Sequence, residues 1–195
     1  SLSHCSGSGT PRGGVAIYVR EDLEPFTRRQ KDVGDDAQTL WLRIDQDAGF
    51  DRNLSLFCSY FPPSLSPQQL QDCYGSLEAI IPTATADGFV IGAGDFNAHT
   101  GEDQDRKNED SNRPINASGQ HLLDLENKDV GVVIANGRVE GATSGDVTFW
   151  NSQDQKSSVD YFLLCPRLMS TATKLTVQGP SPIEGMDHCP MRVTA

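Results

Sequence analysis

One short segment of the sequence places a carboxylate and an amide where they could hydrolyse a phosphate ester. Asp95-Phe96-Asn97 follows an apolar run in which Gly92 and Gly94 are small. Residues two apart in extended backbone point to the same side, so Asp95 and Asn97 can enter one pocket while Phe96 anchors the turn in the core. The carboxylate could hold a nucleophilic water or protonate the leaving oxygen, and the amide could orient the substrate. Taken alone, such a segment is more often an Asx-rich turn after a strand.

Two further segments supply carboxylates and an imidazole. Asp160 begins an otherwise apolar run, where a carboxylate needs a partner, and a histidine ring is the natural one. Asp187 and His188 are neighbours in a loop before the last expected strand, so their side chains can diverge. The aspartate could face a divalent cation, and the imidazole, oriented by Asp160, could act as general base toward phosphorus. Each segment alone would more often be a strand end facing water or a surface pair.

The composition predicts one globular domain over residues 1–195. Lys and Arg total 16 against 27 Asp and Glu, a net charge of −11 that is opposite to the usual balance of a surface binding a polyanion. Charge therefore argues against strong autonomous binding of nucleic acid, but leaves room for a small basic groove or basic neighbouring domains. The five cysteines include no CxxC pair, which disfavours a zinc ribbon or disulfide framework and fits a reducing compartment. No apolar run is long enough to span a membrane.

The hydrophobic pattern predicts many strands and few helices, which favours an α+β sandwich over a Rossmann sheet. Helices are expected from Pro67, at a first helical position after Ser66, and over 120–128. The charged stretch 102–113 is expected to be a solvated loop. Strands are expected at 14–19 (buried), 40–44 (half-exposed), 54–61, 88–91, 130–134, 147–150, 159–164 and 175–178, with a last strand after His188.

In their order and spacing these segments resemble the endonuclease/exonuclease/phosphatase superfamily, and most closely the apurinic-endonuclease-like endonuclease domain of non-LTR retrotransposons. The resemblance covers nearly the whole chain from about Gly13 and is specific as an ordered set. It rests on the runs 13–19 (GGVAIYV), 58–63 (CSYFPP), 94–101 (GDFNAHTG), 119–125 (GQHLLDL), 135–138 (ANGR), 148–150 (TFW), 158–161 (SVDY) and 187–190 (DHCP).

The resemblance implies a fold and a set of roles. The fold is a DNase-like α/β/β/α sandwich of four layers, two packed and mostly antiparallel sheets with helices outside. Mg²⁺ or Mn²⁺ would be the cofactor and DNA the partner. The implied roles are phosphate contact for Tyr60, handling of the attacking water and leaving group for Asp95 and Asn97, a place on the substrate-facing strand for Thr148, a place near the groove wall for Trp150, orientation of His188 by Asp160, and metal binding for Asp187.

The sequence departs from the superfamily pattern at its beginning. Family members carry an Asn on a first strand and a metal-binding Glu at the end of a second, both upstream of the run 13–19. Only residues 1–12 precede that run here, and Met186 stands where a small hydroxyl residue is usual. The expectation is a domain that is incomplete at its N-terminus and lacks the first strands, with weakened metal binding and catalysis.

Three functions remain open at this point. The first is a DNA-nicking endonuclease, intracellular and by resemblance nuclear. The second is a catalytically inactive, domesticated domain that serves protein partners as a structural subunit of a larger assembly, for instance an organellar complex. The third is a phosphatase or phospholipid phosphodiesterase on the same fold, because fold does not fix substrate; the retrotransposon-like motifs argue against it.

Overall fold

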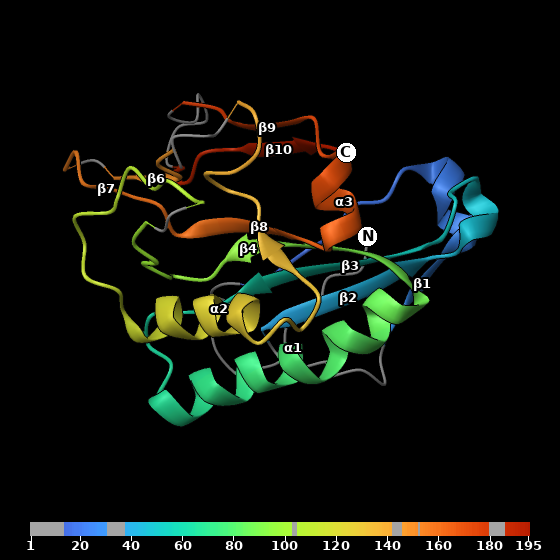
Figure 1. Cartoon of the computed structure of the whole chain (residues 1–195), viewed down its shortest axis with the longest axis horizontal. Coiled ribbons are helices and arrows are strands. Elements are labelled where there is room, and N and C mark those ends of the chain that lie inside the picture. The colour runs from blue at the N-terminus through green and yellow to red at the C-terminus, as the bar shows by residue number, and fades with distance from the viewer. Residues whose placement is uncertain (1–13, 31–37, 103–104, 142–145, 152, 180–185) are drawn as a thin grey trace.

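A six-stranded sheet forms the centre of the molecule in a computed structural model (Figure 1). The structure describes residues 14–30, 38–102, 105–141, 146–151, 153–179 and 186–195. Only the pair β3–β4 is parallel, and the other neighbours run antiparallel. In spatial order the strands are β1 (Thr27–Arg29), β2 (Thr39–Ile44), β3 (Asn53–Tyr60), β4 (Gly88–Asp95), β8 (Asp160–Leu164) and β5 (Val133–Ile134).

Helix α1 (Pro67–Asp87) connects the two parallel strands, as a parallel pair requires. Pro62 and Pro63 end the preceding strand, since proline cannot donate to a ladder. A capping box starts the helix, because the Ser66 hydroxyl accepts from the Gln69 amide at 3.3 Å and the Gln69 side chain accepts from the Ser66 amide at 2.9 Å. The strand–helix–strand unit therefore brings the ends of β3 and β4 to one edge.

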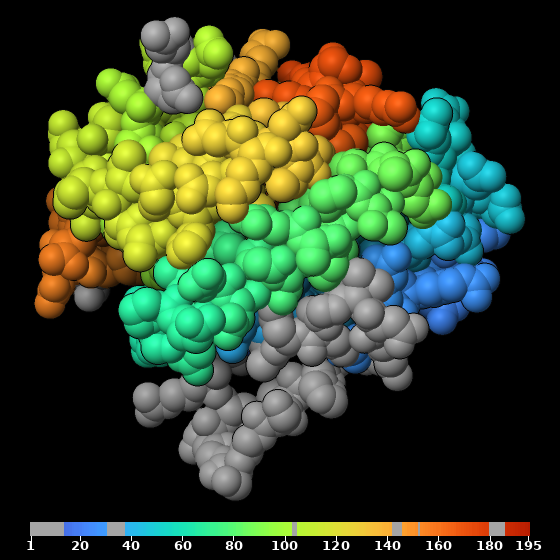
Figure 2. Space-filling model, turned by 60° about the horizontal axis from the view of Figure 1, so that its bottom comes forward, coloured from blue at the N-terminus to red at the C-terminus, as the bar shows by residue number. Residues whose placement is uncertain are grey.

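The helices α1 and α2 (Ala117–Asn127) cover one face of the central sheet and lie side by side (Figure 2). Asn116 caps α2 by accepting from the Gly119 amide at 2.8 Å. The main core lies between these helices and the sheet, and burial of its apolar side chains is the main source of stability for this layer. Its largest buried members are Trp41, Tyr74, Phe61, Phe96, Tyr161, Leu77, Ile81, Leu122, Leu125, Ile134 and Leu163.

The opposite face of the sheet carries a thinner layer of short strands (Figure 1). It contains the pair β9 (Lys174–Val177) with β10 (Met191–Thr194), the hairpin β6 (Phe149–Trp150) with β7 (Lys156–Ser157), and helix α3 (Pro166–Thr171). A second core joins this layer to the sheet through Ala135, Val139, Leu164 and Leu175. Short 3₁₀ helices, η1 (Glu21–Phe26) and η2 (Gln46–Ala48), flank β1 and β2. The predicted α+β sandwich is confirmed.

Two local predictions were wrong. The segment 14–19 is not a buried strand: it belongs to no sheet of the described residues, its exposure alternates, and Tyr18 is 85% exposed. A strand needs a neighbour's hydrogen bonds, which hydropathy alone does not report. Strand β2 is buried on both faces rather than half-exposed. The described part of the charged stretch 102–113 is a largely exposed loop, as expected, but Arg106 within it is 1% exposed and donates to the carbonyls of Thr100 and Gly101.

The remaining expected elements form within a few residues of their predicted bounds. Helix α2 begins three residues earlier than expected, β4 continues to Asp95, and the strand expected at 130–134 shortens to β5. The sequence did not indicate α3, β1, β7 or the 3₁₀ helices. None of the helices in the described part of the chain is long and apolar enough to cross a membrane.

Candidate active site

Strand register places three of the predicted site residues in one row. Tyr60 on β3 is opposite Asp95 on β4, and Asp95 is opposite Asp160 on β8. Residues directly opposite each other in a sheet point to the same face. Their sequence neighbours Ser59 and Tyr161 are buried toward the helices, so this row faces the other side, where the short strands lie.

The turn after β4 fixes the Asp95 carboxylate. The Asn97 backbone amide donates to Asp95 Oδ1 at 2.9 Å, and the Asn97 side-chain amide donates to Asp95 Oδ2 at 3.1 Å and to the Phe61 carbonyl at 3.0 Å. Asn97 has φ 46°, a left-handed conformation that asparagine tolerates. Phe96 is fully buried between the two polar residues. The Asn97 amide therefore orients Asp95 in this structure.

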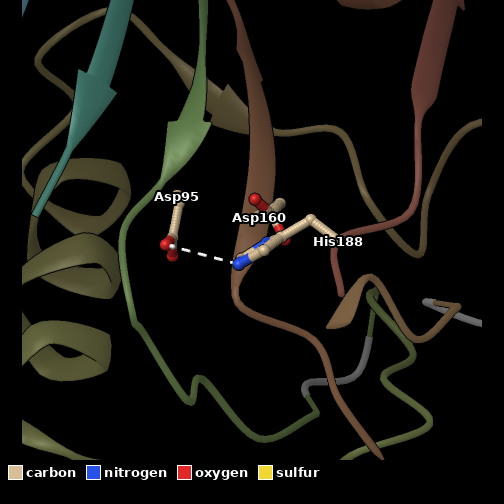
Figure 3. Close-up of side chains that lie close together, drawn as sticks. All are labelled: Asp95, Asp160 and His188. Atoms are coloured by element: carbon tan, nitrogen blue, oxygen red, sulfur yellow. Dashed lines mark hydrogen bonds and ion pairs between the residues drawn. The ribbon is translucent and has the colours of Figure 1, made fainter. Parts of the chain in front are cut away.

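His188 makes the central contact of the site (Figure 3). Its Nδ1 lies 2.9 Å from Asp160 Oδ2, a hydrogen bond that leaves Nε2 directed at Asp95 and Asp187. Nε2 is 3.9 Å from Asp95 Oδ2 and 4.0 Å from Asp187 Oδ1. These separations are too long for hydrogen bonds. They are short enough for one water molecule or phosphoryl oxygen to lie within reach of both Nε2 and a carboxylate. The His188 ring thus sits among three carboxylates, of which Asp95 and Asp160 come from distant segments and Asp187 is its own neighbour in the sequence.

Strand β6 holds the loop that carries His188. The Trp150 amide donates to the Asp187 carbonyl at 2.6 Å, and the Cys189 amide donates to the Thr148 carbonyl at 2.6 Å. The Phe149 ring packs edge-on against the imidazole, with centroids 5.1 Å apart and planes at 68°. Sequence reasoning missed Phe149, although its place between two singled-out residues in an alternating strand was a usable signal.

The two predicted substrate-binding residues of this strand lie in different environments. Thr148 is fully buried, and its hydroxyl accepts from the amides of Val159 and Asp160 at 3.0 Å each. Its hydroxyl is therefore in the interior and is occupied by two backbone amides. Trp150 is half-buried on the hairpin, where Lys156 Nζ lies 3.7 Å from the ring centroid and the indole donates to Asp154.

The proximity of these groups shifts two pKa values upward. Burial raises the pKa of Asp95 from 3.8 to about 6, and the nearby Asp160 carboxylate adds to the rise. The hydrogen bond to Asp160 raises the pKa of His188 from 6.5 to about 8, and the charges of Asp160, Asp95 and Asp187 act in the same direction. The two shifts place the pKa values of Asp95 and His188 on either side of neutral pH.

The same groups could hold a cation. Ligand atoms of Asp95, Asp160 and His188 all lie within 4.8 Å of one another. Asp187 is the most exposed of the three carboxylates, at 57% of its side chain against 16% for Asp95 and 15% for Asp160. Magnesium prefers oxygen ligands and keeps several waters, so a few carboxylates suffice. Repulsion from Asp160 adds to the rise that burial causes in the pKa of Asp95, and a cation would relieve that repulsion, so this donor set fits a hard divalent ion.

Comparison with known proteins identifies the family. The model of the endonuclease/exonuclease/phosphatase family matches residues 2–182, and the chain belongs to this family. No curated protein matches the sequence significantly. The fold is thus that of the endonuclease/exonuclease/phosphatase family.

Solved structures of nucleases and a phosphatase share this fold at low sequence identity. The 3′ phosphatase NExo from Neisseria, bound to a product DNA hairpin, has a TM-score of 0.61 and 14% identity over 86% of this chain and 69% of that chain. The endonuclease domain of TRAS1, a telomere-specific non-LTR retrotransposon, gives 0.56 and 18% over 85% and 64%. The AP endonuclease of Leishmania major gives 0.62 and 16% over 89% and 61%. The chain thus spans under two thirds of the last two structures.

Proposed function

We propose that this protein is a divalent-metal-dependent phosphodiesterase that nicks DNA, in the manner of a retrotransposon-type endonuclease. The observation that supports it most directly is the 2.9 Å hydrogen bond between Asp160 and His188, which aims Nε2 at Asp95 and Asp187. An imidazole oriented by one carboxylate and facing another is an arrangement suited to proton transfer at a phosphate ester. The retrotransposon-like motifs and the DNA-acting structural relatives support DNA as the substrate.

The protonation states suggest how the two central residues divide the work. Because the pKa of Asp95 is about 6 and that of His188 about 8, we infer that Asp95 accepts the proton of the attacking water. The imidazolium would stabilise the charge that develops on the phosphoryl group and donate its Nε2 proton to the leaving oxygen as the bond from that oxygen to phosphorus breaks. This assignment reverses the expectation that His188 is the general base. Asn97 would keep the Asp95 carboxylate in place during proton transfer.

Asp187 is the proposed principal ligand for Mg²⁺ or Mn²⁺, since its carboxylate is the most exposed in the site. A bound cation would neutralise charge on the phosphoryl oxygens. Tyr60, opposite Asp95 on the neighbouring strand, is the proposed contact for the scissile phosphate. Trp150, stacked against Lys156, is the proposed wall of the substrate groove, where aromatic and cationic groups both favour nucleic acid.

A plasmid-nicking assay on the natural full-length protein tests the proposal. Supercoiled plasmid should relax in the presence of Mg²⁺ or Mn²⁺ and stay intact with chelator. His188→Ala should abolish nicking, because it removes the group that faces both Asp95 and Asp187. His121→Ala is the matched control. His121 lies on α2 and stacks on Tyr74 of α1, in the helical layer on the other face of the sheet from the site. Absence of nicking by the wild-type protein, together with absence of Mn²⁺ binding, would leave the structural-subunit hypothesis instead.

A further inference from the structure

Along the half of β8 that carries Asp160, side chains bind one edge of the strand's backbone where a neighbouring strand would usually pair. On the side away from β4, β5 pairs with Leu163 and Leu164, and the Ala135 amide then donates to the Phe162 carbonyl at 2.8 Å. Beyond that point, side chains take the hydrogen bonds that a strand would otherwise take. A buried backbone amide or carbonyl needs such a partner.

Two buried side chains supply these bonds. Asn136, 4% exposed, accepts from the Phe162 amide at 2.8 Å and donates to the Asp160 carbonyl at 3.2 Å. Thr148 Oγ1 accepts from the amides of both Asp160 and Val159 at 3.0 Å. The carbonyl and the amide of Asp160 are thus each held by a different side chain, one from the turn after β5 and one from the segment before β6.

We propose that Thr148 and Asn136 are positioning residues that hold the Asp160 main chain so that its carboxylate meets His188. Thr148 contributes twice, because its own carbonyl also accepts from the Cys189 amide at 2.6 Å and so ties down the segment carrying His188. One residue therefore binds the backbone on both sides of the Asp160–His188 hydrogen bond. The consequence for catalysis rests on the function proposed above, whereas the effect on the hydrogen bond does not.

We call the hydrogen bonds that Thr148 and Asn136 make to the main chain of Asp160 the clamp. Its chemistry limits which side chains can replace Thr148. A hydroxyl oxygen has two lone pairs and can accept two amide hydrogens at once. Serine keeps that oxygen, whereas valine has the shape of threonine without an acceptor. Alanine leaves space into which a water can enter, and two amide donors are enough partners to retain one. The three substitutions therefore separate the acceptor from the packing.

Two quantities are measured. The first is kcat and KM for plasmid nicking. The second is the His188 Nδ1–H resonance in proton NMR spectra at low pH, where this proton is hydrogen-bonded to Asp160. Thr148→Val should lower kcat by ~10- to ~100-fold, the usual range when an outer partner of a functional side chain is removed. KM should change little, because the side chain touches no substrate. The slowly exchanging Nδ1–H resonance of His188 and the exchange protection of the Asp160 amide should be lost as well.

Thr148→Ser should restore both kcat and the Nδ1–H resonance. Thr39→Val is the matched control: it removes a buried hydroxyl that is bonded to Ser59 in the same sheet, and it should leave both readouts unchanged. If Thr148→Val does not fold, Asn136→Asp takes its place as the test, because the space left by Thr148→Ala can hold a water that accepts both amide hydrogens. Asn136→Asp, which keeps the acceptor but loses the donor to the Asp160 carbonyl, should lower kcat in parallel.

The outcomes distinguish failure of the clamp from failure of the proposed function. Retention of the His188 Nδ1–H resonance and of wild-type kcat in Thr148→Val, or in Asn136→Asp where Thr148→Val does not fold, would overturn the clamp. If the wild-type protein does not nick DNA at all, the proposed function fails. Loss of the resonance and of Asp160 amide protection in Thr148→Val, with retention in Thr148→Ser, would then still support the clamp as a structural device.

Discussion

Replacing Asp160 by asparagine should destabilise the protein in acid far more than in alkali. The substitution keeps the side-chain shape but removes the charge that His188 Nδ1 contacts at 2.9 Å. The rise in the pKa of His188 from 6.5 to about 8 corresponds to ~2 kcal/mol at about 1.4 kcal/mol per pH unit. The His188 side chain is 34% exposed, so solvent screening reduces the expected loss to ~1 kcal/mol.

The sign of the pH dependence follows from the direction of the shift. The folded protein binds the His188 proton more tightly than the unfolded chain does, so this contribution is complete below pH 6.5 and is lost as pH rises through 8. The neighbouring Asp95 reinforces the trend, because removing the Asp160 charge lowers the pKa of Asp95 and relieves carboxylate repulsion above pH 6. Asp160→Asn should therefore cost ~1 kcal/mol near pH 6 and close to nothing near pH 9.

Urea unfolding of metal-free wild-type and Asp160→Asn protein at pH 6 and pH 9 measures this difference. An NMR titration of the His188 imidazole in both proteins measures the pKa directly. Asp72→Asn is the control, since Asp72 is an exposed carboxylate on α1 that accepts from Gln68. An equal loss of unfolding free energy at both pH values, with the pKa of His188 unchanged, would refute the coupling between Asp160 and His188.

Four further outcomes are expected. The plot of kcat/KM for nicking against pH should be bell-shaped, falling below about pH 6 as Asp95 gains a proton and above about pH 8 as His188 loses one. A flat profile across this range would exclude them as the proton-transferring pair. Tyr60→Phe should lower activity by ~10-fold while the melting temperature is retained, since one hydrogen bond to a charged phosphate is worth ~1.5–3 kcal/mol at most; full activity would remove Tyr60 from the site. Asp187→Asn should weaken Mn²⁺ binding by ~10-fold or more in calorimetry, whereas Asp72→Asn should not. Gly94→Ala should destabilise the fold by ~1–3 kcal/mol in thermal unfolding, because the added methyl would overlap the Ser59 carbonyl, whereas Gly75→Ala on helix α1 meets open space and should stabilise it.

Local signals in the sequence were reliable where the physics is local. Ser66 and Pro67 start α1 because capping and a fixed φ act within one turn. The alternation of Asp95, Phe96 and Asn97 predicted two polar side chains about a buried ring, and the structure has that arrangement. The run 14–19 was misjudged because its hydropathy resembles that of a buried strand, while strand formation depends on a neighbour elsewhere in the chain.

The sequence by itself indicated the α+β class through its hydrophobic pattern, and it indicated the family and the full set of candidate residues through the resemblance of its ordered motifs. Tertiary structure alone decided that Asp95, Asp160 and His188 converge, because strand register and the tie between β6 and the His188 loop join residues far apart in the chain. It also decided that Thr148 faces inward and that Asn136 stands beside Asp160. A side chain's partner across a sheet is set by register, and a shift of one residue would reverse the face that each presents.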